Sequence, residues 1–248
     1  MIPTNFIEIE GKFKDLFKSG MNYVVQDGII DFVNTEEPLM PDNYGDILEK
    51  RYNRWVKSRF MMKLVWGVDL DSLPKIDQYI KNYPEGIILD CPVGTGVFSS
   101  EIYKALPERE FIAADYSLNM LKIGKRYCER LGIRNVCFIR ADVGSLPFRD
   151  KVFSGVVSLN GFHAFTSPHQ AASEFHRVTK EKGGLMMVVS CGKERFISDL
   201  FIKHMMIPKG YFANFLSSKE YSYILKESGY QEVNYQMMGA SMISCSIA

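Results

Sequence analysis

The stretch Ile88–Phe98, "ILDCPVGTGVF", decides the fold class of this chain. Its first residues form a short apolar run, which predicts a buried strand, and a turn of small residues and a helical pattern follow. Small residues let a backbone approach a ligand closely, and a helix N-terminus offers free N–H groups to an anionic ligand group. The stretch therefore predicts a ligand-binding turn between a strand and a helix, with a carboxylate, Asp90, at the end of the strand.

Short apolar runs alternate with helical patterns from Gly86 onward, which predicts parallel strands joined by crossover helices. The predicted strands are "GIILDC", "EFIAAD", "NVCFIRAD", "SGVVSLN", "GLMMVVS", "YQEVNYQMM" and "ASMISCSIA". No helical pattern separates the last two runs, so we expect one antiparallel strand at or near an edge. The fold class is therefore α/β, with a mostly parallel sheet.

The first 80 residues have a different pattern. "NYVVQDGIIDFV" predicts a hairpin, and the residues from Tyr44 to Val65 predict a helix. We expect a hairpin and helical cap over residues 1–80 and an α/β domain over residues 81–248.

Composition limits the class of protein. A chain of 248 residues with 46% hydrophobic content can bury a large core, and a net charge of +1 gives no overall attraction to nucleic acid or an anionic membrane. The five cysteines and four histidines show no metal-ligand spacing, so we expect no metal site and a reducing compartment. No signal peptide or apolar span of about 18 residues is evident, which predicts a soluble, cytoplasmic protein without a membrane partner.

Three aspartates follow successive predicted strands. Open α/β sheets bind ligands beyond the carboxyl ends of their strands, where Asp90, Asp115 and Asp142 stand. Asp115 lies 19 residues beyond Gly96, a position from which a carboxylate accepts hydrogen bonds from both hydroxyls of a ribose. Asp142 is placed to accept a bond from an exocyclic adenine amine. The alternative is that the three aspartates only cap helices and turns.

The ordered set of motifs resembles the class I S-adenosylmethionine-dependent methyltransferases. The matching segments are "ILDCPVGTG", "AADYSLNML", "ADVGSLPFRDKVFSGVVSLN", "FHRVTKEKGG" and "LKESGYQEV". The resemblance implies a Rossmann-like sheet of seven strands, helices on both faces, and S-adenosylmethionine across the carboxyl edge. The cofactor-binding residues that it implies are Asp90, Pro92, Gly94, Thr95, Gly96, Asp115, Tyr116, Asp142, Val143, Asn160 and Gly161.

The parts of the cofactor are assigned by the same resemblance. It implies that the methionine part lies against the turn and that the ribose lies on Asp115. It further implies that the adenine lies beside Tyr116, Asp142 and Val143, and that both cofactor and substrate are faced by Asn160 and Gly161. Pro92 departs from the family pattern, which has glycine there, and it removes one N–H donor from the turn.

A nicotinamide-binding fold is the alternative to this cofactor. Residues 94–99 fall one glycine short of GxGxxG, and Asp90 would repel a pyrophosphate. We therefore expect methyl transfer by direct displacement to a small, partly apolar molecule, with S-adenosylhomocysteine as the product. His163 is a candidate general base, and its alternative role is in the pocket wall.

Two functions other than small-molecule methylation stay open. One predicted helix carries aromatic residues together with Lys50, Arg54 and Lys57. Basic residues among aromatic ones are typical of RNA binding, which would indicate an RNA methyltransferase. The alternative is a cap helix whose charged face is solvated. "YVVQDGIIDFV" is similar to the tail of a zinc-ribbon leader in some bacterial methyltransferases, but the cysteine pairs of the ribbon are absent. The other function that stays open is that of a regulatory protein, which would bind S-adenosylmethionine without turnover.

Overall fold

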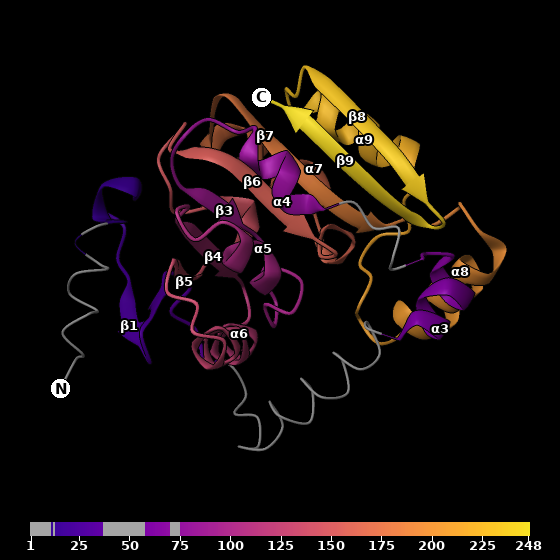
Figure 1. The fold of residues 1–248 in the computed structure, drawn as a ribbon, viewed down its shortest axis with the longest axis horizontal. Coiled ribbons are helices and arrows are strands. Elements are labelled where there is room, and N and C mark those ends of the chain that lie inside the picture. The colour runs from indigo at the N-terminus through magenta and orange to yellow at the C-terminus, as the bar shows by residue number, and fades with distance from the viewer. Residues whose placement is uncertain (1–10, 12, 37–57, 70–74) are drawn as a thin grey trace.

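A nine-stranded sheet forms the centre of the molecule in the computed structural model, which describes residues 11, 13–36, 58–69 and 75–248. The strands follow the order β1-β2-β5-β4-β3-β6-β7-β9-β8 (Figure 1). Their bounds are β1 Val24–Gln26, β2 Ile29–Asp31, β3 Ile88–Asp90, β4 Phe111–Asp115, β5 Val136–Arg140, β6 Phe153–Leu159, β7 Thr179–Ser190, β8 Glu232–Met238 and β9 Ser241–Ile247. The α/β class and the mostly parallel sheet are confirmed.

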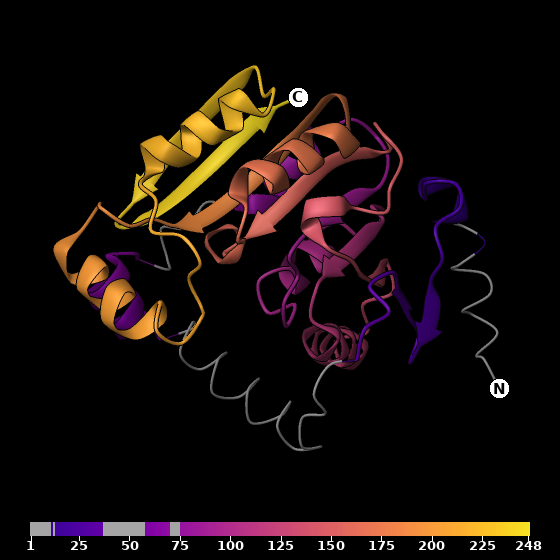
Figure 2. The same ribbon diagram turned by 180° about the vertical axis from the view of Figure 1, so that it is seen from behind.

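Helices cover both faces of this sheet (Figures 1 and 2). Their bounds are α3 Arg59–Met61, α4 Ile76–Lys81, α5 Ser100–Ala105, α6 Leu118–Arg130, α7 Pro168–Val178, α8 Phe196–Phe201 and α9 Ser218–Glu227. Two of the three apolar core clusters in the described residues contain buried side chains from these helices. Phe175 of α7 and Tyr221 of α9 belong to one, and Ile80 of α4, Tyr103 of α5 and Leu121 of α6 belong to the other.

Capping side chains fix where two of the long helices begin. The Ser117 hydroxyl accepts the Met120 N–H at the start of α6, and Ser217 and Glu220 form a reciprocal capping box at the start of α9. Each cap follows the end of a strand or a loop at the carboxyl edge of the sheet. The helices therefore start at that edge and direct their N-termini toward it.

The eighth and ninth positions of the sheet confirm the prediction for the C-terminal runs. β9 pairs antiparallel with both β7 and β8, and it lies next to the edge strand β8. The predicted strand count of seven is too low by two, because the N-terminal hairpin joins the sheet instead of standing apart from it.

The hairpin is built on the turn Asp27–Gly28. Both residues have positive φ, 53° and 72°, which is the conformation that an Asp-Gly hairpin turn requires. Strand β2 then pairs parallel with β5, where Asp31 lies opposite Arg140. The side chains of this pair form a buried ion pair with a distance of 3.0 Å between Nη1 and Oδ2. The hairpin is thus bonded to the sheet through its backbone and through a charge pair.

Part of the predicted cap lies outside the described residues. The helix predicted from Tyr44 to Val65 is described only at its end, where α3 continues into a π-helical turn, Met62–Trp66. Lys50, Arg54 and Lys57 all fall outside the described ranges. The division into a cap of residues 1–80 and a domain of residues 81–248 stays a prediction.

Candidate functional site

The carboxyl ends of β3 and β4 bring the glycine turn and Asp115 together. The Gly94 backbone N–H donates to Asp115 Oδ2 at 2.8 Å, and the Ser117 N–H donates to Oδ1 at 2.9 Å. Two backbone donors therefore fix the plane of this carboxylate. Each carboxylate oxygen can accept more than one hydrogen bond.

Asp90 is a buried carboxylate with one unsatisfied oxygen. Its Oδ2 accepts a hydrogen bond from the Tyr103 hydroxyl, whereas Oδ1 has no partner among the described residues. Burial raises the pKa of Asp90 to about 6, and the negative charge of Asp115 adds to this rise. An orphaned, buried carboxylate oxygen fits a cationic N–H donor, such as the amino group of the methionine part of S-adenosylmethionine.

The turn after β3 lines a small cavity. Gly94 and Gly96 have φ values of +56° and +70°, a region in which a side chain would be strained. The cavity has a volume of about 70 Å³. It is lined by Pro92, Val93, Gly94, Thr95, Val97, Phe98, Leu159, Asn160 and Gly161. The structure thus joins the predicted residues after β3 with those after β6.

Asn160 is held in a left-handed conformation at the end of β6. Its φ is +55°, its backbone N–H donates to the Val188 carbonyl at 2.7 Å, and its Oδ1 accepts the Ser190 hydroxyl at 3.0 Å. Both contacts bond the end of β6 to β7. Gly161 then follows with its Cα against the ring of Pro92, where a Cβ would lie 2.1 Å from Pro92 Cγ.

Gly161→Ala is expected to push the Pro92 ring into the cavity or to displace the end of β6. Overpacking of this kind costs about 1–3 kcal/mol, and it weakens any ligand held by the turn. Urea unfolding and calorimetric titration with S-adenosylhomocysteine would measure the two effects. Gly11→Ala is the matched control, because a Cβ at Gly11 meets nothing within 4 Å. Equal stability and affinity in both variants would contradict the close packing of Gly161 on Pro92.

The predicted adenine side is more exposed. Tyr116 has 55% of its surface exposed, and the guanidinium carbon of Arg140 lies 5.8 Å from the centroid of its ring. Asp142 caps a short 3₁₀ turn, Val143–Ser145, by accepting the Gly144 N–H at 2.8 Å. Asp142 therefore caps a turn, which was the alternative to a cofactor contact. Its contact with adenine stays a prediction.

His163 lies on the 3₁₀ turn Phe162–Ala164 after β6. Its ring is buried and stacks on Phe212, with 3.9 Å between the ring centroids. Burial lowers the pKa of His163 to about 3, so the imidazole is neutral at pH 7 and is a weak base. It is not among the residues that line the small cavity. A role as general base stays a prediction that this environment disfavours.

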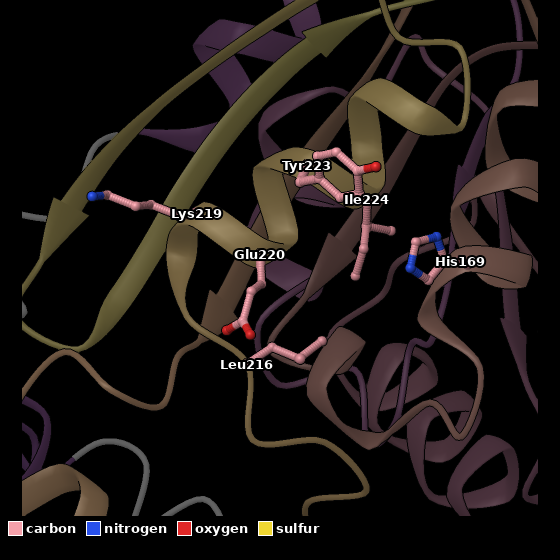
Figure 3. A pocket seen from close by; sticks show the side chains of 6 residues that line it. All are labelled: His169, Leu216, Lys219, Glu220, Tyr223 and Ile224. Carbon is pink, nitrogen blue, oxygen red and sulfur yellow. The ribbon is translucent and has the colours of Figure 1, made fainter.

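A second, larger cavity lies apart from these residues. It has a volume of about 350 Å³ between the start of α7 and helix α9. Figure 3 shows the residues that line it, which are His169, Leu216, Lys219, Glu220, Tyr223 and Ile224. The Glu220 carboxylate accepts hydrogen bonds from the Lys193 ammonium group and the Ser217 N–H. These contacts lower the pKa of Glu220 to about 2. None of the predicted cofactor residues lines this cavity.

Comparisons with known proteins agree with this arrangement. A family model described as a methyltransferase domain matches residues 88–183. The chain is 32% identical over 147 residues to a ubiquinone/menaquinone biosynthesis C-methyltransferase of Wigglesworthia glossinidia brevipalpis, covering 56% of this chain and 57% of that protein. It is 34% identical over 139 residues to a demethylmenaquinone methyltransferase of Renibacterium salmoninarum, covering 55% of each.

A solved structure shows the same fold. The crystal structure of a SAM-dependent methyltransferase from Aquifex aeolicus superposes with a TM-score of 0.58 at 17% identity, covering 80% of this chain and 98% of that one. The chain spans just over half the length of the two curated relatives above.

Proposed function

We propose that the protein transfers a methyl group from S-adenosylmethionine to a small, partly apolar molecule, because residues 88–183 match a family model described as a methyltransferase domain. The proposed cofactor is supported best by the hydrogen bond from the Gly94 backbone N–H to the Asp115 carboxylate. The buried Asp90 oxygen that has no partner among the described residues adds to this support. A dinucleotide site gives no use for a buried carboxylate next to the glycine turn, since its charge would repel a pyrophosphate.

The residues of this chain would bind and orient the reactants. Asp115 would hold the ribose, and Asp90 would pair with the amino group. The bound cofactor supplies a methyl group activated on a sulfonium, which the acceptor nucleophile takes in one displacement. The N–H groups of the turn and the residues after β6, Asn160 and Gly161, would exclude water and align the two groups. We assign His163 a packing role in the turn after β6, because its ring stacks on Phe212.

The acceptor is proposed from the relatives and from the apolar surroundings. Both relatives described above are named for quinones: one is a ubiquinone/menaquinone biosynthesis C-methyltransferase, and the other is a demethylmenaquinone methyltransferase. Phe98 lines the small cavity and is partly exposed, and the segment after β7 adds Phe201 and Phe212 to an apolar cluster. We infer that the first acceptors to test are demethylated quinones, with the ring carbon as the nucleophile.

Asp115→Ala is expected to weaken the binding of S-adenosylhomocysteine by about 10- to 150-fold. This range corresponds to the loss of hydrogen bonds to a charged group, about 1.5–3 kcal/mol. Calorimetric titration of wild type and variant with S-adenosylhomocysteine, and of the wild type with S-adenosylmethionine and NADH, measures both the site and the choice of cofactor. Asp77→Ala on α4 is the matched control, because Asp77 forms a helix-surface ion pair with Lys81.

The titration separates the proposals from their alternatives. Unchanged affinity in Asp115→Ala would remove Asp115 from the ribose site. Binding of NADH in place of the sulfur nucleotides would overturn the proposed function. Cofactor binding with no methylation in a panel of quinone, other small-molecule and RNA acceptors would favour a regulatory protein without turnover.

A further inference from the structure

A two-helix projection stands beyond the ends of β6 and β7. One arm is α3 with its π-helical turn, and the other is α8 with a second π-helical turn, Ile202–Met206 (Figures 1 and 2). The Ser198 hydroxyl donates to the Val65 carbonyl at 2.6 Å, and the Arg195 guanidinium donates to the same carbonyl at 3.1 Å. Trp66 stacks on Phe212 beneath the arms. The arms therefore form one packed unit.

Both arms of this projection expose large apolar side chains, which we call the apolar tip. The apolar tip consists of Phe60, Leu64, Phe196, Ile197 and Leu200. Phe60 is 72% exposed and Phe196 is 81% exposed, the two highest values among the exposed large hydrophobic residues described. Phe60 and Leu64 are four residues apart, as are Phe196 and Leu200, so each pair shares a helix face. Clustered exposure of this kind is typical of an interaction site.

The segments that carry the apolar tip contain more basic than acidic residues. Residues 58–69 and 195–211 contain five lysines and arginines but only two aspartates, whereas the whole chain carries a net charge of +1. Lys63 and Lys203 are both exposed on the two arms. Basic side chains beside exposed aromatic and leucine residues match the anionic headgroups and acyl boundary of a membrane surface. The same charge on two copies would repel, which disfavours self-association through this face.

We propose that the apolar tip docks on the surface of an anionic lipid membrane. In the described part of the chain, no helix has the length and apolarity to cross a bilayer, so the contact is interfacial. The balanced charge of the whole sequence predicted no membrane partner, but that balance conceals a local excess of basic residues. Docking in this way brings the segment that follows β7 to the bilayer surface, and it does not require any particular acceptor.

Vesicle sedimentation tests the docking with the full chain and without cofactor or acceptor, so the result is independent of methyl transfer. We expect the protein to sediment with vesicles of phosphatidylcholine and phosphatidylglycerol, to sediment less with phosphatidylcholine alone, and to be released by salt. The double variant Phe60→Ser/Phe196→Ser is expected to bind the anionic vesicles at least about tenfold more weakly, because two aromatic side chains are lost from the contact.

Tyr223→Ser is the matched control, since Tyr223 is 60% exposed on α9, outside the apolar tip. It is expected to bind vesicles like the wild type, and circular dichroism would verify the fold of every variant. Equal sedimentation with both vesicle types, or equal binding by the double variant and the wild type, would overturn the proposal. So would a dimer, seen by analytical ultracentrifugation, that the double variant abolishes, because the apolar tip would then bind a second copy.

Discussion

Replacing Arg140 with methionine is expected to lower the free energy of unfolding by about 3–5 kcal/mol. The guanidinium is buried, pairs with Asp31 at 3.0 Å, and donates to the Thr35 carbonyl at 2.7 Å and to the Tyr116 carbonyl at 2.9 Å. Its removal leaves the Asp31 carboxylate buried without its cation. Urea unfolding followed by circular dichroism would measure the loss.

Two further variants show whether the loss comes from the charge pair. Arg140→Met combined with Asp31→Leu removes both charges, so we expect it to recover much of the stability lost in Arg140→Met. Lys122→Met is the matched control, because Lys122 pairs with Asp27 at 2.9 Å on the surface, where ion pairs contribute about 0–1 kcal/mol. A loss below 1 kcal/mol in Arg140→Met would show that the pair is not buried in solution.

Asp90→Asn is expected to remove a decline in stability between about pH 4 and pH 6. The pKa of Asp90 in the folded protein is about 6, against an ordinary value of 3.8, so the folded state binds more protons in this window. Stability therefore falls as the pH rises through it, by about 3 kcal/mol, because each pKa unit corresponds to about 1.4 kcal/mol. Urea unfolding at several pH values, without cofactor, compares the slopes of the two proteins.

The same substitution tests the proposed contact with the cofactor. Pairing with an ammonium group requires the ionised carboxylate, so the affinity of the wild type for S-adenosylhomocysteine should rise up to tenfold per pH unit below about pH 6 and level off above it. Asp90→Asn should bind more weakly and without this slope. Parallel pH slopes for the two proteins would separate Asp90 from the amino group.

The sequence predicted the elements whose patterns are local. "ILDCPVGTG" predicted both β3 and the turn, because a buried strand and small residues leave a signal within a few positions. The positions of Asp90, Asp115 and Asn160 at strand ends follow from the same alternation. Their distances and contacts do not, since Tyr103 reaches Asp90 from the following helix.

Long-range partners could not be predicted. Arg140 reads as one polar residue at the end of a strand, and its burial depends on a hairpin strand 109 positions earlier in the chain. The environment of His163 likewise depends on Phe212, which belongs to a segment without a clear pattern. The predicted cap helix failed to reveal the apolar tip, because exposure is a property of the packed helices and not of their composition.

The pairing of β2 with β5 also affects the order in which the chain acquires structure during synthesis. Ile29 and Ile30 are fully buried in the finished protein, but their partner strand is translated more than 100 residues later. Until β5 emerges from the ribosome, these two side chains and the open edge of the hairpin lack their native cover. The nascent chain therefore carries a hairpin with one open strand edge, and its docking completes only after β5 exists.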